Sequence, residues 1–169
     1  MVHSIELLFD RDTEAAIRRI WADLATAGIP SQAPASRPHV TLAVAERIAP
    51  DVDALLRPVA QQLPLRCTVG ASVLFGRSNA VLARLIVPTA ELLAVHAEVH
   101  RICGPYLLAG PMPNSLPGQW TAHVTLAHRV GGAQLGRALR IAGRPSEIRG
   151  AMAGLRRWDG SKRVDHLIS

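Results

Sequence analysis

The residues best suited to chemistry in this chain lie in a pentapeptide, His-Val-Thr-Leu-Ala, that occurs twice. The first copy spans residues 39–43 and the second spans residues 123–127. Such a repeat is expected by chance in at most on the order of a few per cent of chains this long. An imidazole can accept or donate a proton near neutral pH, and a hydroxyl can donate a hydrogen bond to a phosphate oxygen. Each copy therefore offers an acid or base group beside a hydrogen-bond donor.

Both copies are expected to begin a β-strand, because Val and Thr are β-branched. Side chains alternate along a strand, so His39 and Thr41 share one face while the intervening Val and Leu anchor the other face in a core. His123 and Thr125 are arranged in the same way. Facing each other across a cleft, the two histidines would form an acid and base pair, each contributing roughly 10² to 10⁴ to the rate.

A simpler interpretation is that the pentapeptide is only a favourable strand sequence and that each histidine is a satisfied, half-buried residue. One copy alone would favour this simpler interpretation. Two copies with the same facing favour a functional pair.

Paired His-x-Thr-apolar motifs, one in each half of a chain of this size, resemble those of the 2H phosphoesterases. RPHVTLA and TAHVTLA are most similar to the bacterial group of 2′-5′ RNA ligases and RNA 2′,3′-cyclic phosphodiesterases. The resemblance implies an α+β fold, a bilobal pseudo-twofold arrangement of two antiparallel sheets with outer helices and a central cleft. It also implies that His39 and His123 are catalytic, that Thr41 and Thr125 bind substrate phosphate, and that no metal or other cofactor is needed.

Side chains near the motifs are further candidates. Members of the group often carry a basic residue shortly after the second motif, and alternation places Arg129, not His128, on the face of His123. Arg129 is therefore the candidate phosphate contact. Arg37 could approach the cleft or be a solvated loop arginine, because the proline after it makes its direction unreliable. Trp120 could stack on a base, although a tryptophan entering a strand more often belongs to the core.

A second histidine pair, His96 and His100, could bind a metal ion on one face of a predicted helix. The pattern is not HExxH, Glu98 lies on a different face, and no third ligand follows. A solvated or partly buried helix face is the favoured interpretation, and we expect no metal site.

Composition sets broad limits on the chain. Its 169 residues are 49% apolar, which fits a single domain over residues 1–169 with two internally related lobes. The net charge is +6, and every basic residue except Lys162 is arginine. This favours anionic partners, although a genomic coding bias explains the arginines equally well. Cys67 and Cys103 form no CxxC pattern, so each is expected to be a small buried residue.

No apolar run reaches the roughly 18 residues that span a bilayer, and the N-terminus lacks the plan of a signal peptide. We therefore expect a cytoplasmic protein without a membrane partner. Its expected partner is an RNA end or a small nucleotide substrate. The sequence does not define the oligomeric state, and a monomer is favoured.

Hydrophobic periodicity predicts the elements that hold the motifs. Strands are expected over residues 4–9, 39–45 and 120–130, a hairpin over residues 65–87, and a terminal strand or hairpin over residues 148–167. A first helix capped by Asp12 or Thr13 runs to Gly28, and later helices cover residues 51–63, 89–103 and 133–141. Pro58 must kink or shorten the helix that contains it. Residues 30–38 and 108–118 are expected to be loops, the second of them a lid or binding loop.

The expected function is metal-independent hydrolysis of 2′,3′-cyclic phosphates at RNA ends or in related nucleotides, with reversible 2′-5′ ligation as a further activity. The roles of acid and base stay open between His39 and His123. The alternative is a non-catalytic RNA- or nucleotide-binding module with a basic cleft. Such a module would keep its binding after both histidines were replaced by Gln, and an aromatic content of only 4% weakens the case for it.

Overall fold

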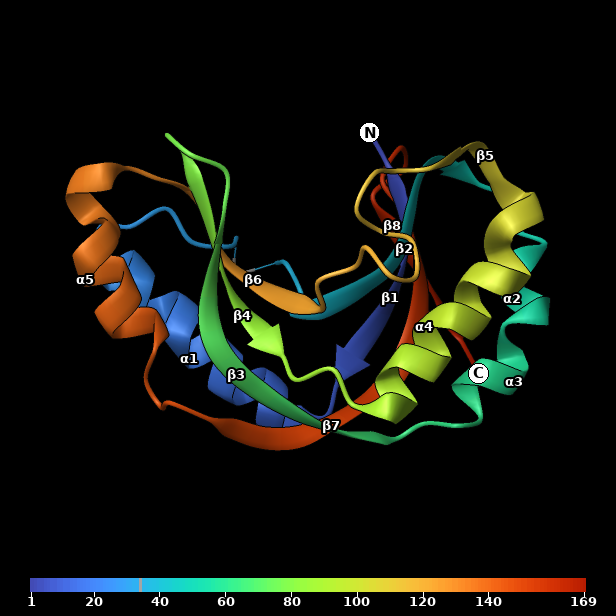
Figure 1. Ribbon diagram of the computed structural model, residues 1–169, viewed down its shortest axis with the longest axis horizontal. Helices are drawn as coiled ribbons and strands as arrows, with labels where there is room; N and C mark the ends of the chain where they lie inside the picture. Colours follow the sequence, from blue (N-terminus) through green and yellow to red (C-terminus); the bar gives the residue numbers. More distant parts are fainter. Residues whose placement is uncertain (34) are drawn as a thin grey trace.

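The computed structural model describes residues 1–33 and 35–169 and shows an α+β fold (Figure 1). Within these residues, eight antiparallel strands form one open sheet in the order β5-β2-β1-β7-β3-β4-β6, with β8 beside β7. The predicted α+β class is confirmed, and the two expected sheets are the two halves of this continuous sheet. The predicted loop over residues 30–38 includes Pro34, which lies outside the described residues.

The strands are β1 (His3–Phe9), β2 (His39–Ile48), β3 (Leu65–Phe75), β4 (Ala80–Ile86), β5 (Leu107–Pro111), β6 (His123–Val130), β7 (Ile148–Asp159) and β8 (Val164–Ile168). The helices are α1 (Arg11–Thr26), α2 (Val52–Leu55), α3 (Arg57–Ala60), α4 (Ala90–Cys103) and α5 (Gly132–Ala142), with a 3-10 turn at Gly104–Tyr106. No helix in the described part of the chain is long and apolar enough to cross a membrane.

The order of elements repeats, as the two motif copies suggest. The unit β1-α1-β2 in the first half corresponds to β4-α4-β6 in the second half, and in each unit the two strands pair in antiparallel fashion. The long strands β7 and β3 extend the two units by pairing with β1 and β4. They also pair with each other, and this pairing joins the two halves of the sheet.

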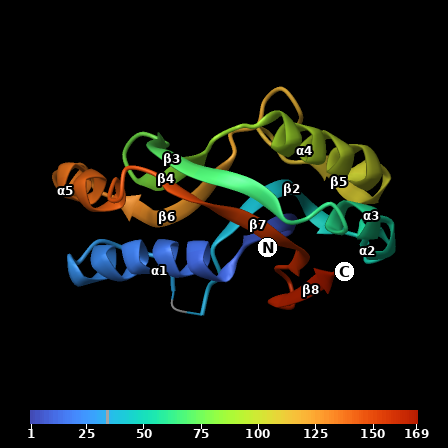
Figure 2. The same cartoon turned by 90° about the horizontal axis from the view of Figure 1, so that it is seen from below.

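Each of the two longest helices contacts the motif strand of the other half of the sheet. α1 follows β1 and contacts β6 and α5 as well as β7, whereas α4 follows β4 and contacts β2 together with α2 and α3. Figure 1 shows α1 and α5 at one end of the sheet and α2, α3 and α4 at the other, and Figure 2 shows α1 and α4 on opposite faces of the strands. The two halves are therefore interlocked through their helices.

Helix and strand ends follow local chemistry with a few corrections to the sequence prediction. The N-cap of α1 is Asp10, whose side chain accepts a hydrogen bond from the Thr13 backbone N–H, and not Asp12 or Thr13. Thr89 caps α4 as predicted. The segment that contains Pro58 forms two short helices, because proline cannot continue the preceding turn.

Two strand predictions also need correction. The predicted loop over residues 108–118 begins with β5, a short edge strand that pairs with β2. The predicted strand over residues 120–130 begins only at His123. All seven residues of β1 are buried, and this strand lies between β2 and β7 in the sheet.

Candidate active site

The two motif strands meet although they belong to opposite halves of the sheet. β2 and β6 contact each other, and in Figure 1 they lie at the centre of the molecule. Within each motif the side chains alternate as predicted: the histidines and threonines are half-buried, and the intervening residues are fully buried. The half-buried residues are His39, Thr41, His123 and Thr125, and the buried ones are Val40, Leu42, Val124 and Leu126.

An equivalent bulge follows the threonine in both copies. In β2, Thr41 pairs with Glu6 and Ala43 with Ile5, so that Leu42 is the extra residue. In β6, Thr125 pairs with Ala83 and Ala127 with Leu82, and Leu126 is the extra residue. A bulge bends the strand and increases its twist, which turns the His and Thr side chains away from the plane of the rest of the strand.

The carbonyl groups at each bulge are satisfied by side chains from other elements. The Leu42 oxygen lies 2.9 Å from His100 Nε2, and the Leu126 oxygen accepts a hydrogen bond from Ser31 Oγ at 3.3 Å. The preceding threonine oxygens each accept an indole N–H: Trp120 donates to Thr41 at 3.0 Å, and Trp21 donates to Thr125 at 3.2 Å. These bonds fix the backbone on which the motif side chains stand.

Both histidine rings are oriented by the same backbone contact. His39 Nδ1 lies 2.8 Å from the Arg37 oxygen, and His123 Nδ1 lies 2.7 Å from the Thr121 oxygen. Because a carbonyl oxygen only accepts hydrogen bonds, Nδ1 carries the proton in each ring. Nε2 is then the nitrogen that can take up or release a proton, as an acid and base pair requires.

The two imidazoles are close enough for their charges to interact. Burial lowers the pKa of His123, the Thr121 carbonyl opposes this effect, and a positive charge on His39 lowers the pKa further. The His123 ring also lies against Phe75, with 4.6 Å between ring centroids. The neutral form of His123 is therefore favoured at neutral pH.

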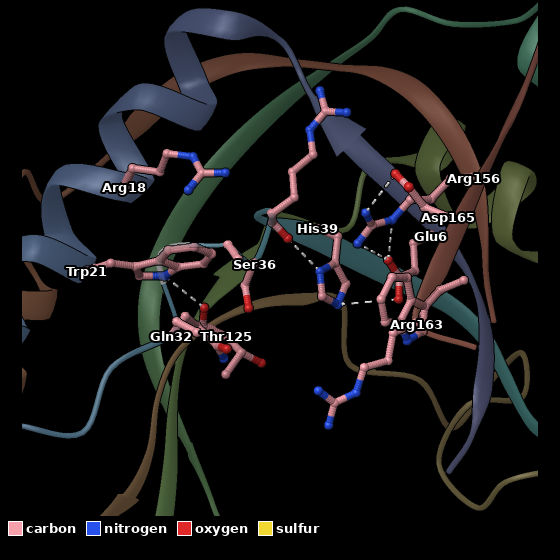
Figure 3. A pocket seen from close by; sticks show the side chains of 14 residues that line it. Glu6, Arg18, Trp21, Gln32, Ser36, His39, Thr125, Arg156, Arg163 and Asp165 are labelled. Carbon is pink, nitrogen blue, oxygen red and sulfur yellow. Dashed lines mark hydrogen bonds and ion pairs between the residues drawn. The ribbon is translucent and has the colours of Figure 1, made fainter. Parts of the chain in front are cut away.

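A cavity of about 710 Å³ opens beside His39 and Thr125, a volume typical of small-molecule sites. Figure 3 shows Arg18 and Trp21 on one side of His39, with Glu6, Arg156, Asp165 and Arg163 on the other. The polar and aromatic side chains that line the cavity, beside the two motif residues, are Glu6, Arg18, Trp21, Gln32, Ser36, Arg37, Arg156, Trp158, Arg163 and Asp165. Four arginines among them make this cavity suitable for an anionic ligand.

The structure places Arg37 at the cavity and also in an ion pair. Its Nε lies 2.9 Å from Glu14 Oε2, and Arg18 Nη2 lies 3.1 Å from Glu14 Oε1. α1 thus anchors two of the arginines that line the cavity. The Arg37 backbone oxygen orients His39. Arg37 therefore supports the site through its main chain as well as its side chain.

Arg129 is not among the residues that line this cavity. The alternation that placed it beside His123 and Thr125 stops at the bulge, where Leu126 and Ala127 are both buried. Arg129 itself is exposed and has a φ of 55°. Its predicted contact with substrate phosphate stays a prediction.

His96 packs in the core, and His100 contacts the backbone of the first motif strand. The His96 ring is 1% exposed, stacks on Trp120 with 3.8 Å between ring centroids, and has Nε2 2.8 Å from the Ser115 oxygen. Burial, the dominant cause, lowers the pKa of His96 to about 4, and a charge on His100 lowers it further. The stacking also shows that Trp120 packs against a core side chain. Cys67 and Cys103 are buried free cysteines, as predicted.

Comparison with protein-family models places residues 9–160 in a family described as the 2′-5′ RNA ligase superfamily. The chain belongs to this superfamily. Its members are 2H phosphoesterases, as the paired motifs predicted, and membership indicates an enzyme that acts on a phosphodiester or cyclic phosphate. A search of curated proteins finds no significant match.

Solved structures share the fold of the superfamily. The protein TT0787 of Thermus thermophilus is 15% identical, with a TM-score of 0.61 over 100% of this chain and 96% of that chain. Kluyveromyces marxianus Usb1 is 13% identical, with a TM-score of 0.57 over 99% of this chain and 97% of that chain. The MHV ns2 PDE domain is 13% identical, with a TM-score of 0.52 over 89% of each chain.

Several residues at the site were missed by sequence reasoning. Glu6 reaches His39 from β1, Arg156 contacts Glu6 from β7, and Arg163 and Trp158 come from the C-terminal hairpin. One signal was present for Glu6, since a carboxylate stands between apolar residues in a short strand. A buried charge in such a place requires a partner.

Proposed function

We propose that the protein is a metal-independent phosphodiesterase that opens 2′,3′-cyclic phosphates at RNA ends or in related nucleotides. The observation that supports this most directly is the matched arrangement of His39 and His123. Both rings donate Nδ1–H to a backbone oxygen two residues earlier, both keep Nε2 for proton exchange, and their charges interact. One acid and one base of this kind are sufficient to hydrolyse a phosphodiester.

In the proposed reaction, one imidazole removes a proton from water as the water oxygen attacks phosphorus. The other imidazole donates its proton to the ribose oxygen as the bond between that oxygen and phosphorus breaks. Thr41 and Thr125 donate hydrogen bonds to the non-bridging oxygens, where negative charge builds up. Reversible 2′-5′ ligation would use the same two groups with their proton roles reversed.

The surroundings of His39 fit an anionic nucleotide. The cavity beside His39 combines arginines with the indole rings of Trp21 and Trp158, and such rings can stack on a base. A structure of Kluyveromyces marxianus Usb1 contains uridine monophosphate, which makes uridine nucleotides a reasonable first choice of test substrate.

The proposal is tested by incubating the protein with a panel of 2′,3′-cyclic nucleotides, oligonucleotides ending in a cyclic phosphate, and 2′-5′-linked dinucleotides. Products are identified by mass spectrometry, with and without EDTA. His39→Ala and His123→Ala are measured beside His166→Ala, a substitution in β8 away from both motifs. We expect turnover of at least one cyclic phosphate by the wild type and the His166 variant, with losses of about 10²-fold or more in the two motif variants.

Turnover that survives in both motif variants would assign the activity to a different site or a contaminant. Tight nucleotide binding without any turnover would favour the binding-module alternative, and loss of activity with EDTA would favour a metal-dependent mechanism. Each of these results contradicts the proposal.

A further inference from the structure

Three exposed arginines follow the second motif strand. Arg137 and Arg140 stand on α5, where a spacing of three residues places them on one face, and Arg144 stands just after the helix ends. We call these three residues the α5 arginines. The other side of the helix packs against the core through apolar residues: Leu135, Ala138, Leu139 and Ala142.

Carboxylates are absent from the part of the sheet that carries the α5 arginines. β3, β4, β6 and α5 contain no Asp or Glu. Within residues 1–33 and 35–169 the α5 arginines form no ion pair, and the next carboxylate along the chain, Glu147, is bound to Arg149. α1, which contacts α5, carries three arginines and three carboxylates and so adds no net charge. The protein itself therefore does not neutralise the α5 arginines.

Two more arginines add positive charge at this end of the molecule. Arg77 lies in the turn between β3 and β4, Arg129 lies near the end of β6, and both are exposed. Pairing of Ala80 with Val130 brings this turn and the end of β6 together. Figures 1 and 2 both show α5 at the same end of the molecule as the turn. This end is therefore suited to a ligand that carries several negative charges.

The composition of α5 favours a chain of phosphates over a membrane surface as that ligand. A helix that lies on a membrane presents an exposed apolar face beside its basic residues. The exposed residues of α5 are only glycine, alanine and arginine, and its leucines pack against the core. A guanidinium can donate two hydrogen bonds to one phosphate, so neighbouring arginines suit the successive phosphates of a nucleic-acid strand.

α5 also lies close to the candidate active site. β6 begins at His123, and α5 begins two residues after β6 ends. α1 supplies Arg18 and Trp21 to the cavity and contacts α5. Gln134 of α5 donates a hydrogen bond to the Gly28 oxygen, just after α1, at 3.1 Å. A strand whose end is bound beside the motif histidines must continue across neighbouring surface, and α5 provides positive charge there.

We propose that the α5 arginines bind the phosphodiester backbone of a single-stranded RNA whose cyclic phosphate end lies at the motif histidines. The placement of that end rests on the proposed function. The preferred substrate is then an oligonucleotide and not a free mononucleotide. Because the arginines contact phosphates, they strengthen binding without reading the base sequence of the strand.

The kinetic test replaces all three α5 arginines by glutamine, which keeps a good helix former at each position. The substrates are an RNA of about ten nucleotides that ends in a 2′,3′-cyclic phosphate and the mononucleotide uridine 2′,3′-cyclic phosphate. We expect KM for the RNA to rise by about 10-fold or more, with KM for the mononucleotide and both kcat values unchanged. A triple variant with lysine at the same positions keeps the charge and should retain most of the affinity for RNA.

The matched control changes the net charge by the same amount elsewhere. Arg47, Arg57 and Arg66 are exposed residues of β2, α3 and β3, and no ion pair involves them within the described ranges. Their triple replacement by glutamine should leave KM for the RNA within about 2-fold of the wild type. Urea denaturation of each triple variant verifies that it is folded.

A binding measurement needs no turnover. Fluorescence anisotropy with a labelled RNA of about ten nucleotides that ends in a 3′-hydroxyl gives Kd as a function of salt concentration. Loss of three phosphate contacts should reduce the slope of log Kd against log salt by about 2, since each contact to a single strand contributes roughly 0.7. The control variant should keep the wild-type slope.

Equal weakening in the α5 and control variants would show an effect of net charge alone and overturn the proposal. Unchanged RNA binding in the α5 variant would overturn it as well, including a result in which that variant loses only binding to vesicles of phosphatidylserine and phosphatidylcholine. If the wild type cleaves neither substrate, the proposed function fails, while the anisotropy comparison still decides whether the α5 arginines bind RNA.

Discussion

The indole nitrogen of Trp120 donates a hydrogen bond to the backbone oxygen of Thr41 across 3.0 Å. Trp21 makes the matching bond to Thr125 in the other half of the molecule. Neither tryptophan belongs to the unit of sheet that it supports: Trp21 stands on α1, and Trp120 stands in the segment before β6. Each motif strand is therefore held by a side chain from the opposite part of the chain.

Trp120→Phe tests this support, because it keeps an aromatic ring and removes only the N–H donor and part of the ring. The Thr41 carbonyl would lose a partner in a partly buried place, so we expect the free energy of unfolding to fall by about 1–3 kcal/mol. Urea denaturation measures the change. Trp158→Phe is the control, since its indole donates no hydrogen bond among the described residues; a larger loss in that control would contradict the interpretation.

The two motif histidines should lose activity in a strongly non-additive way. His39→Ala and His123→Ala each break the same proton-transfer unit, so the double variant should be only slightly less active than either single variant. Values of kcat/KM for the three variants measure this directly. Losses that multiply would show that the two imidazoles act independently.

The pH dependence of kcat/KM should be bell-shaped, because one imidazole must be neutral and the other protonated. Burial and the charge of His39 lower the pKa of His123. His123 therefore stays neutral at pH values somewhat below the ordinary pKa of histidine. We therefore expect the acid limb of the profile to lie below about pH 6.5. An acid limb that lies above that value would rule out His123 as the base.

Local patterns explain why the motif strands and most helices could be predicted from the sequence. The His-Val-Thr-Leu-Ala repeat carries its own alternation, and Thr89 carries its own cap. The partnership of Glu6 with Arg156 could not be predicted in this way, because it depends on the register between strands that lie 150 residues apart. The same limit applies to β5, whose Gly- and Pro-containing segment pairs only because β2 presents an open edge.

Arg129 also shows where alternation stops being informative. An extra residue in a strand changes the facing of the residues after it, and the pairing of β6 with β4 shifts twice after the motif threonine, once at Leu126 and once between Ala127 and Val130, where Arg129 has a φ of 55°. Both shifts are features of the pairing between β4 and β6, so the residues of β6 alone do not reveal them.

Arg84 should be important for stability although its side chain does not line the cavity. It is 1% exposed and donates hydrogen bonds to the backbone oxygens of Val69, Gly70, Ala142 and Ser146. Arg84→Met would leave these oxygens without their donor, and we expect a loss of about 3 kcal/mol or more in the free energy of unfolding. Arg149→Met, at an exposed ion pair with Glu147, should change it by less than about 0.5 kcal/mol. Urea denaturation of both variants gives the comparison, and similar losses would contradict it.

Arg163→Ala and Arg129→Ala compare two arginines that could bind substrate phosphate. Arg163 lines the cavity beside His39, and Arg129 does not. Loss of one charged hydrogen bond of about 1.5 kcal/mol or more should raise KM by roughly 10-fold in the Arg163 variant, with little change in kcat. Steady-state kinetics with the preferred substrate measure both constants. A larger effect in the Arg129 variant would support the original prediction for Arg129 instead.

The exchange of long helices between the two halves has a consequence for how the chain becomes a folded protein. A fragment ending before α4 would keep β1 and β2 but lack the helix that packs against β2, and the complementary fragment would lack α1 beneath β6. Neither fragment encloses its own apolar interior. Two such pieces mixed in solution would become ordered only by assembling with each other, so the halves resemble repeats in sequence without being units that can exist alone.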